Sequence, residues 1–277
     1  DYDPLGGIFG SKWIGFENFK FLFHSSDTIY ILRNTLLYNV AFIILNTLFS
    51  VGMAVLLAEI TNRLAVKFYQ TALLLPSLVS TVILSYMVLL FLDGKTGYIN
   101  NTILSFLNRS PVSWYSEPKY WPFILVFVTV WKGIGYSMII YLSSIVGISV
   151  DYFEAARIDG ATDARVFFSV SLPLAKVGLV SVILFMALQY WNDFYLSLYL
   201  ITKTDLYTLQ KLLYNMMANI SALLSGSKTV ADAAHITIPS NTARMVMTML
   251  TVLPVVAFYP FAQKYFVKGV TIGAVKG

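Results

Sequence analysis

The sequence predicts an all-α, polytopic membrane protein, and three observations lead to this fold class. Charged residues make up only 12% of the 277-residue chain, whereas a soluble domain has about 25%. Hydrophobic residues make up 57% and aromatic residues 16%. The chain also contains five apolar segments, each long enough to cross a hydrocarbon core of ~30 Å as a helix. In lipid, a helix satisfies its own backbone hydrogen bonds, so all five are predicted to be helices.

The first segment, residues 1–33, is mixed in character and is predicted to be extracytoplasmic. Its aromatic cluster favours a short helix at a membrane surface, where such rings accumulate. The cluster consists of Trp13, Phe16, Phe19, Phe21 and Phe23. The chain begins at Asp1, so one further span upstream, giving six in the full protein, would place a native N-terminus in the cytoplasm.

The remainder, residues 34–277, is predicted to be a transmembrane domain. Its five spans lie at about 35–60, 70–92, 120–147, 174–202 and 242–266. Pro76 and Pro254 fall inside spans and are expected to kink them. For Asn46 in the first span, a hydrogen bond between helices is the favoured interpretation.

The connections between the spans differ in their density of lysine and arginine. Basic residues are about twofold denser in 61–69, 148–176 and 265–277 than in the alternate set. The positive-inside rule therefore places residues 148–173 and the C-terminus in the cytoplasm. The connection 203–240 is placed on the extracytoplasmic side. In it, leucine and methionine recur at three- and four-residue steps, which predicts an amphipathic helix over 206–224.

Several function classes are disfavoured by the sequence. There is no cysteine, so thiolate metal sites and cysteine nucleophiles are excluded. His24 and His235 fall in predicted loops, and no metal site or catalytic residue is expected. The small net charge of +5 is spread along the chain, which indicates membrane orientation rather than nucleic-acid binding.

Polar residues inside the third and fourth spans form a second group of candidates. Lys132 lies near the middle of the third span, and Asp193 lies towards the end of the fourth. Charges at this depth are costly and should face a cavity or a partner. Two interpretations are equally open: a polar, aromatic substrate path, or structural pairing between helices. The candidate path residues are Trp131, Lys132, Tyr190, Trp191, Asn192 and Asp193.

The most polar stretch between two spans is the 148–173 loop. Asp151 is a candidate N-cap with Glu154 three positions later, which is the capping-box spacing. Gly160 interrupts the helical pattern, which resumes over 164–171 before Pro173. The residues alone favour an ordinary solvated connector over a helix pair that docks in another protein.

A motif in this loop favours the docking interpretation instead. Glu154-Ala155-Ala156, three residues, Gly160, nine residues, Val170, one residue and Leu172-Pro173 resemble the EAA signature of ABC importer permeases. Val170 stands where that signature has Ile. Asp159-Gly160-Ala161 resembles the form found in carbohydrate-uptake permeases of the maltose-transporter type. Further similar segments are 13–19, 131–135 and 191–194, and the tail 263–277 resembles that of alginate- and aldouronate-type permeases.

The resemblance implies that the chain is one subunit of a multi-protein transporter in a bacterial plasma membrane. The chain would be a non-catalytic subunit that forms an oligosaccharide path with a homologous permease, as a heterodimer. Two ABC ATPase subunits would use ATP and Mg, and an extracytoplasmic solute-binding protein would deliver the sugar. The residues implied in ATPase coupling are Glu154, Ala155, Ala156, Asp159, Gly160 and Ala161.

One departure and one alternative accompany this interpretation. The family often has a proline after the Trp-Asn-Asp-Phe segment, but Tyr195 follows Phe194 here. The alternative function is an ion-coupled secondary transporter that uses Lys132 or Asp193. It is disfavoured because the spans are few and the sequence shows no pair of broken half-helices. The identity of the sugar is left open.

Overall fold

A computed structural model of the chain describes residues 7–10, 15, 26–226, 245–260 and 263. Every regular element in these residues is helical, which confirms the all-α prediction. The chain divides into two compact units. The first comprises Asp1–Leu37 and Trp191–Ala257, and the second comprises Tyr38–Tyr190 and Phe258–Gly277.

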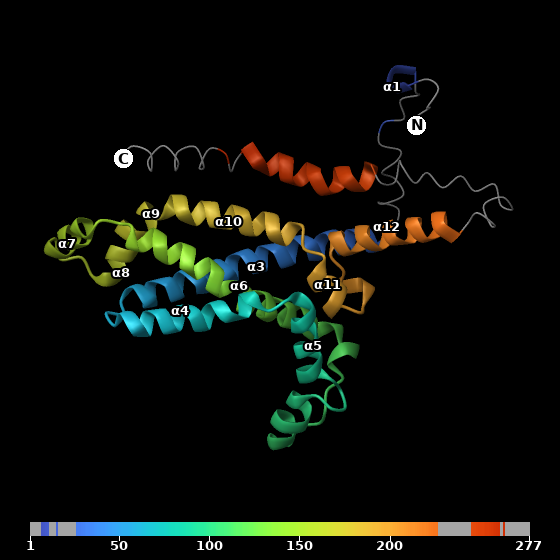
Figure 1. Ribbon diagram of the computed structural model, residues 1–277, viewed down its shortest axis with the longest axis horizontal. Helices are drawn as coiled ribbons and strands as arrows, with labels where there is room; N and C mark the ends of the chain where they lie inside the picture. Colours follow the sequence, from blue (N-terminus) through green and yellow to red (C-terminus); the bar gives the residue numbers. More distant parts are fainter. Residues whose placement is uncertain (1–6, 11–14, 16–25, 227–244, 261–262, 264–277) are drawn as a thin grey trace. The chain divides into compact units, whose positions relative to one another are not determined.

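Long helices form the core of the second unit. These are the later part of α3 (Ser26–Ala58), α6 (Trp121–Val146) and α10 (Lys176–Trp191). They lie side by side in Figure 1 and share one apolar cluster. Its buried members are Ala54, Leu57, Met138, Tyr141, Leu142, Val182 and Met186.

Two glycines allow α6 to approach its neighbours closely. A Cβ at Gly135 would collide with the backbone of Leu73 in α4 (Arg63–Leu78). A Cβ at Gly133 would collide with the amide of Asn46 in α3. Asn46 is fully buried and donates to the Tyr190 hydroxyl at 3.1 Å, which confirms the predicted hydrogen bond between helices. The Lys-Gly-x-Gly pattern of α6 therefore serves close packing.

The predicted second span, 70–92, is not one helix. α4 ends at Leu78, and α5 (Thr81–Leu92) leaves at an angle of 93° to it. The bend follows Pro76, which cannot donate the backbone hydrogen bond of a continuing helix. Ser80 then caps the new helix, since its Oγ accepts the Ile83 N–H at 3.2 Å. The expected kink is thus a complete break.

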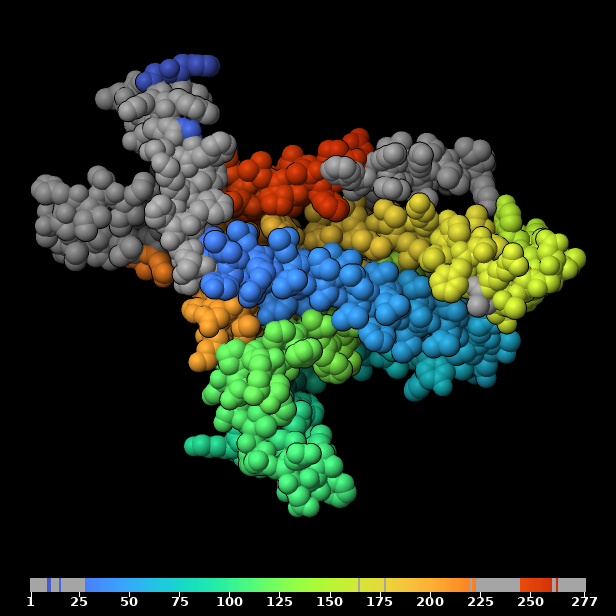
Figure 2. Space-filling view, turned by 180° about the vertical axis from the view of Figure 1, so that it is seen from behind, coloured from blue at the N-terminus to red at the C-terminus, as the bar shows by residue number. Residues whose placement is uncertain are grey.

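Residues 93–120 project from the same unit, as Figures 1 and 2 show. Asn100 holds this projection together: its amide donates to Gly94 O and Val112 O, and its Oδ1 accepts from Trp114 Nε1. Asp93 begins the projection. The Thr96 N–H, the Thr96 hydroxyl and the Lys95 N–H all bond its carboxylate, and they lower its pKa.

The first unit has its own core. It contains the start of α3, α11 (Tyr195–Leu200), the 3₁₀ turn η5 (Thr204–Leu206), α12 (Leu209–Gly226) and most of the helix Met245–Pro260. Its buried cluster is Ile31, Leu209, Leu213 and Met247. Thr35 Oγ1 accepts the Leu209 N–H at 2.8 Å and so fixes the first turn of α12. α12 confirms the amphipathic helix predicted over 206–224, although it begins at Leu209, after the η5 turn.

The predicted spans correspond only in part to continuous helices. By length and composition, Thr28–Ala58 and Pro118–Val146 can cross a membrane, and the number rises to four if each bent pair counts as one span. The fourth predicted span, 174–202, is also interrupted, at residues 192–194 between α10 and α11. Within the fifth predicted span, the described residues Met245–Pro260 form one apolar helix. The surface helix predicted around Trp13–Phe23 and both histidines lie outside the described residues.

The glycine packing gives a first prediction. Gly135→Ala should lower the free energy of unfolding by about 1–3 kcal/mol, because the added methyl meets backbone that cannot move aside cheaply. Thermal unfolding in detergent would measure the loss as a lower midpoint. Gly52→Ala is the matched control, since a Cβ there meets nothing within 4 Å. Equal midpoints for the two variants would contradict the close-packing role.

Candidate functional site

The 148–173 loop begins with α7 (Val150–Ile158). Its N-cap is Ser149, so the predicted N-cap at Asp151 is wrong by two residues. Asp151 instead lies in the first turn and accepts a hydrogen bond from Ser149 Oγ at 2.9 Å. Serine and aspartate are both good N-caps, and aspartate is also favoured in a first turn, so the sequence did not distinguish them.

Gly160 ends α7 in a Schellman motif. Its φ is +77°, a region that L side chains rarely adopt. Ala161 N donates to Ala156 O and Gly160 N donates to Arg157 O, both at 3.0 Å. These are the two hydrogen bonds that define the motif. The Gly-centred turn expected from the sequence is therefore observed, with a specific backbone reason for glycine.

The second half of the loop is helical but irregular. It consists of α8 (Asp163–Val166), a π-helical turn η4 (Phe167–Ser171) and α9 (Leu172–Leu174). Arg157 pairs with Asp163 at 3.6 Å across the turn. Both side chains are exposed, so this pair contributes at most ~1 kcal/mol. The backbone hydrogen bonds at Gly160 are the stronger link between the two halves.

The coupling residues predicted from the motif form an accessible surface. Glu154, Ala155, Asp159 and Gly160 are exposed, and Ala156 and Ala161 are half-buried. Apolar side chains beside them are exposed too, including Tyr152 and Ile158. Figure 2 shows the loop at one end of the long-helix unit. Such a mixed polar and apolar surface can bind a protein but does not enclose a small molecule.

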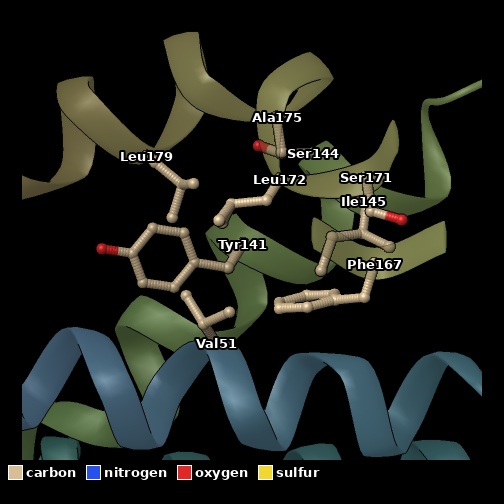
Figure 3. Close-up of a pocket in the computed structure, with 9 residues that line it drawn as sticks. All are labelled: Val51, Tyr141, Ser144, Ile145, Phe167, Ser171, Leu172, Ala175 and Leu179. Carbon is tan, nitrogen blue, oxygen red and sulfur yellow. The ribbon is translucent and has the colours of Figure 1, made fainter. Parts of the chain in front are cut away.

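The base of the loop is packed against the long helices of its unit (Figure 3). Phe167 and Leu172 line a small apolar pocket together with Tyr141 of α6 and Val51 of α3. The cavity is only about 10 Å³, which is too small for a sugar. We therefore interpret it as a packed joint. A displacement of the loop would be transmitted to α3 and α6 through this joint.

Lys132 occupies the break between α4 and α5. Its Nζ donates to the Ser77 carbonyl at 3.2 Å and to the Val79 carbonyl. These carbonyls lie at the C-terminal end of α4, where the helix dipole favours a cation. Of the two open interpretations for Lys132, this geometry favours a structural role. The lysine satisfies backbone groups that the break exposes.

Tyr190 is also engaged in helix packing. Its hydroxyl accepts the Asn46 amide, and its ring lies edge-on to Phe42 with centroids 5.3 Å apart. Trp131, by contrast, is 36% exposed on α6. The structure therefore brings Tyr190 to the buried polar contact between α3 and α10, while Trp131 remains accessible.

Trp191, Asn192 and Asp193 mark the end of α10. Trp191 Nε1 donates to Thr251 O at 3.1 Å. Asp193 Oδ1 accepts the N–H groups of Tyr195 and Leu196, at 2.9 and 3.3 Å, and so starts α11. Asn192 is exposed. The span breaks between α10 and α11 without a proline. At the start of α11 the N–H groups have no backbone acceptor, and the Asp193 carboxylate accepts two of them instead.

Lys211 was not identified from the sequence. It lies in α12 and is only 7% exposed. A signal was present, since Leu209, Leu212 and Leu213 place Lys211 on the apolar face of an amphipathic pattern. Asn100, the centre of the 93–120 projection, was missed as well, because its role depends on contacts twelve and fourteen residues away.

The described residues form a helical membrane protein. Between α6 and α10 it presents an exposed helix–turn–helix, the 148–173 loop. The chain belongs to the family of binding-protein-dependent transport system inner membrane components, whose model matches residues 46–272. This assignment confirms the family suggested by the motif.

Among curated proteins, Protein LplB of Bacillus subtilis is 28% identical over 204 residues, covering 74% of this chain and 64% of the relative. The polygalacturonan/rhamnogalacturonan transport system permease protein YteP of the same organism is 33% identical over 179 residues, covering 64% and 54%. UgpA of Escherichia coli O157:H7, an sn-glycerol-3-phosphate permease, is 31% identical, covering 62% and 56%. The chain spans roughly half to two thirds of the length of these relatives.

The fold resembles a chain of a bacterial alginate ABC transporter solved in complex with an alginate pentasaccharide-bound periplasmic protein. The TM-score is 0.75 at 23% identity, and the match covers 90% of this chain and 81% of the other. At this identity the comparison establishes the fold only.

The position of Lys132 gives a second prediction. Lys132→Met should destabilise the protein by about 1–3 kcal/mol, because two carbonyls at the α4–α5 break lose a charged donor. Lys132→Arg should retain most of the stability. Thermal unfolding in detergent would measure both, and an unchanged midpoint for Lys132→Met would argue against the capping role.

Proposed function

We propose that this chain is a membrane-spanning subunit of an ATP-driven, binding-protein-dependent importer of oligosaccharides. The observation that carries the proposal is the 148–173 loop. It exposes Glu154, Asp159 and Gly160 on a fixed helical turn, and its base is packed into α3 and α6. An exposed recognition surface with a rigid connection to the spans is the arrangement that a coupling element needs.

The loop would dock in a cleft of an ABC ATPase subunit that binds ATP and Mg. Glu154 and Asp159 would pair with basic groups of that subunit, while Ala155, Ala156 and Ala161 allow close approach. When the ATPases close, the loop would move as a lever, and the joint at Phe167 and Leu172 would tilt the long helices. This is alternating access by rigid-body movement.

The remaining parts of the assembly follow from this role. A homologous permease would complete the path, and an extracytoplasmic binding protein would deliver the substrate. Five spans would cross the bilayer, with the 148–173 loop and the C-terminus in the cytoplasm. The bent pairs 63–92 and 167–191 would then each count as one span.

An oligosaccharide substrate is supported by the relatives. YteP is a polygalacturonan/rhamnogalacturonan permease, and the transporter of similar fold was solved with an alginate pentasaccharide. Trp131 and Asn192 are the accessible members of the predicted substrate path, so they are the best candidates for contact with sugar.

The structure contradicts one argument against a secondary transporter. Two bent helix pairs are present, although the sequence showed no broken half-helices. Broken helices with an ionisable residue inside a span are a feature of ion-coupled folds. Here, however, Lys132 bonds the carbonyls of the break, which explains it without an ion.

A third prediction tests the coupling surface. Glu154→Lys should abolish most sugar-stimulated ATP hydrolysis, or prevent assembly with the ATPases, while the permease remains membrane-inserted. Co-purification and hydrolysis in reconstituted vesicles would measure this. Glu117→Lys makes the same charge change in the 93–120 projection and should leave both unchanged. Normal coupling in Glu154→Lys would refute the docking role.

A fourth prediction separates the two energy sources. Uptake into vesicles with constant internal ATP should persist when a protonophore collapses the proton gradient. It should stop when ATP is withheld and the gradient is maintained. The reverse pattern would establish the ion-coupled alternative.

A further inference from the structure

α4 lies along α6 and runs antiparallel to it. Gly135 of α6 meets the backbone of Leu73 in α4, and Lys132, earlier in α6, bonds the carbonyl of Ser77, later in α4. The two helices therefore run in opposite directions. α6 belongs to Pro118–Val146, which by length and composition can cross a membrane. Since α4 packs along this span, it too runs close to the membrane normal.

α5 lies across this direction. It leaves α4 at an angle of 93° and runs away from the long helices in Figure 1. Membrane-spanning helices are tilted by about 20° on average, so a helix perpendicular to α4 lies within roughly 25° of the membrane plane. α5 therefore turns aside from the crossing that α4 makes.

The length of α4 gives the depth at which α5 begins. Its 16 residues extend about 24 Å at ~1.5 Å per residue. Arg63 starts α4 and marks the near boundary of the hydrocarbon core, because a charge is costly inside it. The break then lies about 6 Å inside the far boundary of a core of ~30 Å. This places α5 just beneath the headgroups of the leaflet opposite the 148–173 loop.

Aromatic rings at the start of α6 agree with this depth. α6 has 26 residues and extends about 39 Å, so Trp121 at its start reaches the headgroup region opposite the loop. The ring centroids of Tyr115 and Trp121 lie 4.9 Å apart, and those of Trp114 and Tyr120 lie 5.1 Å apart. Tryptophan and tyrosine accumulate at this level of a bilayer.

The surface of α5 suits acyl chains. The helix carries no charged residue, and Leu84, Val88 and Leu92 form its buried side. At about 100° per residue, the exposed apolar side chains cover roughly 200° of its circumference, whereas docking against a protein needs a stripe of about 100°. Lipid can surround such a wide surface. The exposed side chains are Val82, Ile83, Tyr86, Leu89, Leu90 and Phe91.

Charges return where α5 ends. Asp93 and Lys95 follow the helix directly, which marks the exit of the chain from hydrocarbon. Farther along the 93–120 projection, Phe106 is 86% exposed and Leu107 is exposed beside it. Arg109 is exposed next to them. Apolar side chains flanked by an accessible cation are typical of a segment at a membrane surface.

We propose that α5 and the 93–120 projection form a lipid-binding arm in the leaflet opposite the 148–173 loop. α5 lies in the plane of the membrane with its exposed face against acyl chains. The tip at Phe106 and Leu107 enters the headgroup region, where Arg109 meets lipid phosphates. α4 alone then carries the chain across the bilayer in the 63–92 pair. The arm requires only a membrane-embedded protein and is independent of what the protein transports.

The arm can be tested by measuring depth at pairs of single cysteines, since the chain has none of its own. The full-length protein, with any copurifying subunits made cysteine-free, is spin-labelled in vesicles of phosphatidylethanolamine and phosphatidylglycerol. Collision with oxygen and with a water-soluble nickel chelate reports the depth of each label. Ile83→Cys and Leu90→Cys occupy one exposed face of α5, about 10 Å apart along its axis.

The two α5 labels should lie within about 4 Å of each other in depth, because a helix in the membrane plane keeps both at one level. Phe68→Cys and Leu75→Cys are the matched controls, since they have the same spacing on an exposed face of α4. Their depths should differ by about 10 Å. A label at Phe106→Cys should lie nearer the headgroups than those on α5.

Three results would overturn the arm. A depth difference in α5 as large as that in α4 would show that α5 crosses the bilayer. Collision of both α5 labels with nickel alone would place them in water, and collision with neither reagent would show that protein covers them. A Phe106 label in bulk water would remove the projection from the arm. Val82→Cys and Leu89→Cys repeat the test on an adjacent strip if a first variant fails to fold.

Discussion

The structure depends on the need to satisfy backbone hydrogen bonds wherever a helix is interrupted. In hydrocarbon, water cannot replace a lost backbone partner, so each interruption needs a side chain in its place. Lys132 donates to the carbonyls at the end of α4, Ser80 caps α5, and Asp193 accepts two N–H groups from the first turn of α11. These three polar residues make the broken helices possible. Each of them is compatible with an apolar environment because it forms hydrogen bonds with backbone groups that the interruption leaves unpaired.

Close helix packing supplies the rigidity that coupling requires. Gly133 and Gly135 let α6 approach α3 and α4 closely, and Asn46 joins α3 to Tyr190. The base of the 148–173 loop packs into the same unit at Phe167 and Leu172. Because tightly packed helices transmit displacement, a surface built from Glu154 and Gly160 can act on distant spans. The loop is exposed where it would meet a partner and packed where it meets the helices.

The residues of the predicted substrate path differ in what the structure does with them. Lys132 donates to the carbonyls at the α4–α5 break, and the Tyr190 hydroxyl accepts the Asn46 amide, so helix packing accounts for both. Trp131 and Asn192, by contrast, are exposed. The predicted path therefore contains residues that hold the helices together and residues that stay accessible.

The sequence by itself determined the helical membrane fold, the amphipathic character of α12 and the Gly160 turn. Each follows from local composition and periodicity, or from a backbone conformation that favours glycine. It also identified the family, since the Glu154–Pro173 spacing is a local pattern. The sequence did not determine the N-cap of α7, because Ser149 and Asp151 are both suitable caps.

Only the tertiary structure decided that residues 70–92 and 174–202 are broken and which side chains satisfy the breaks. A run of apolar residues has the same composition whether its helix is straight or bent, and the partner of Lys132 lies more than fifty residues away. The burial of Lys211 was likewise decided by packing. Its position on an apolar face was visible in the sequence, but its burial depends on the packing of α12 against residues distant in the chain, such as Ile31 and Met247.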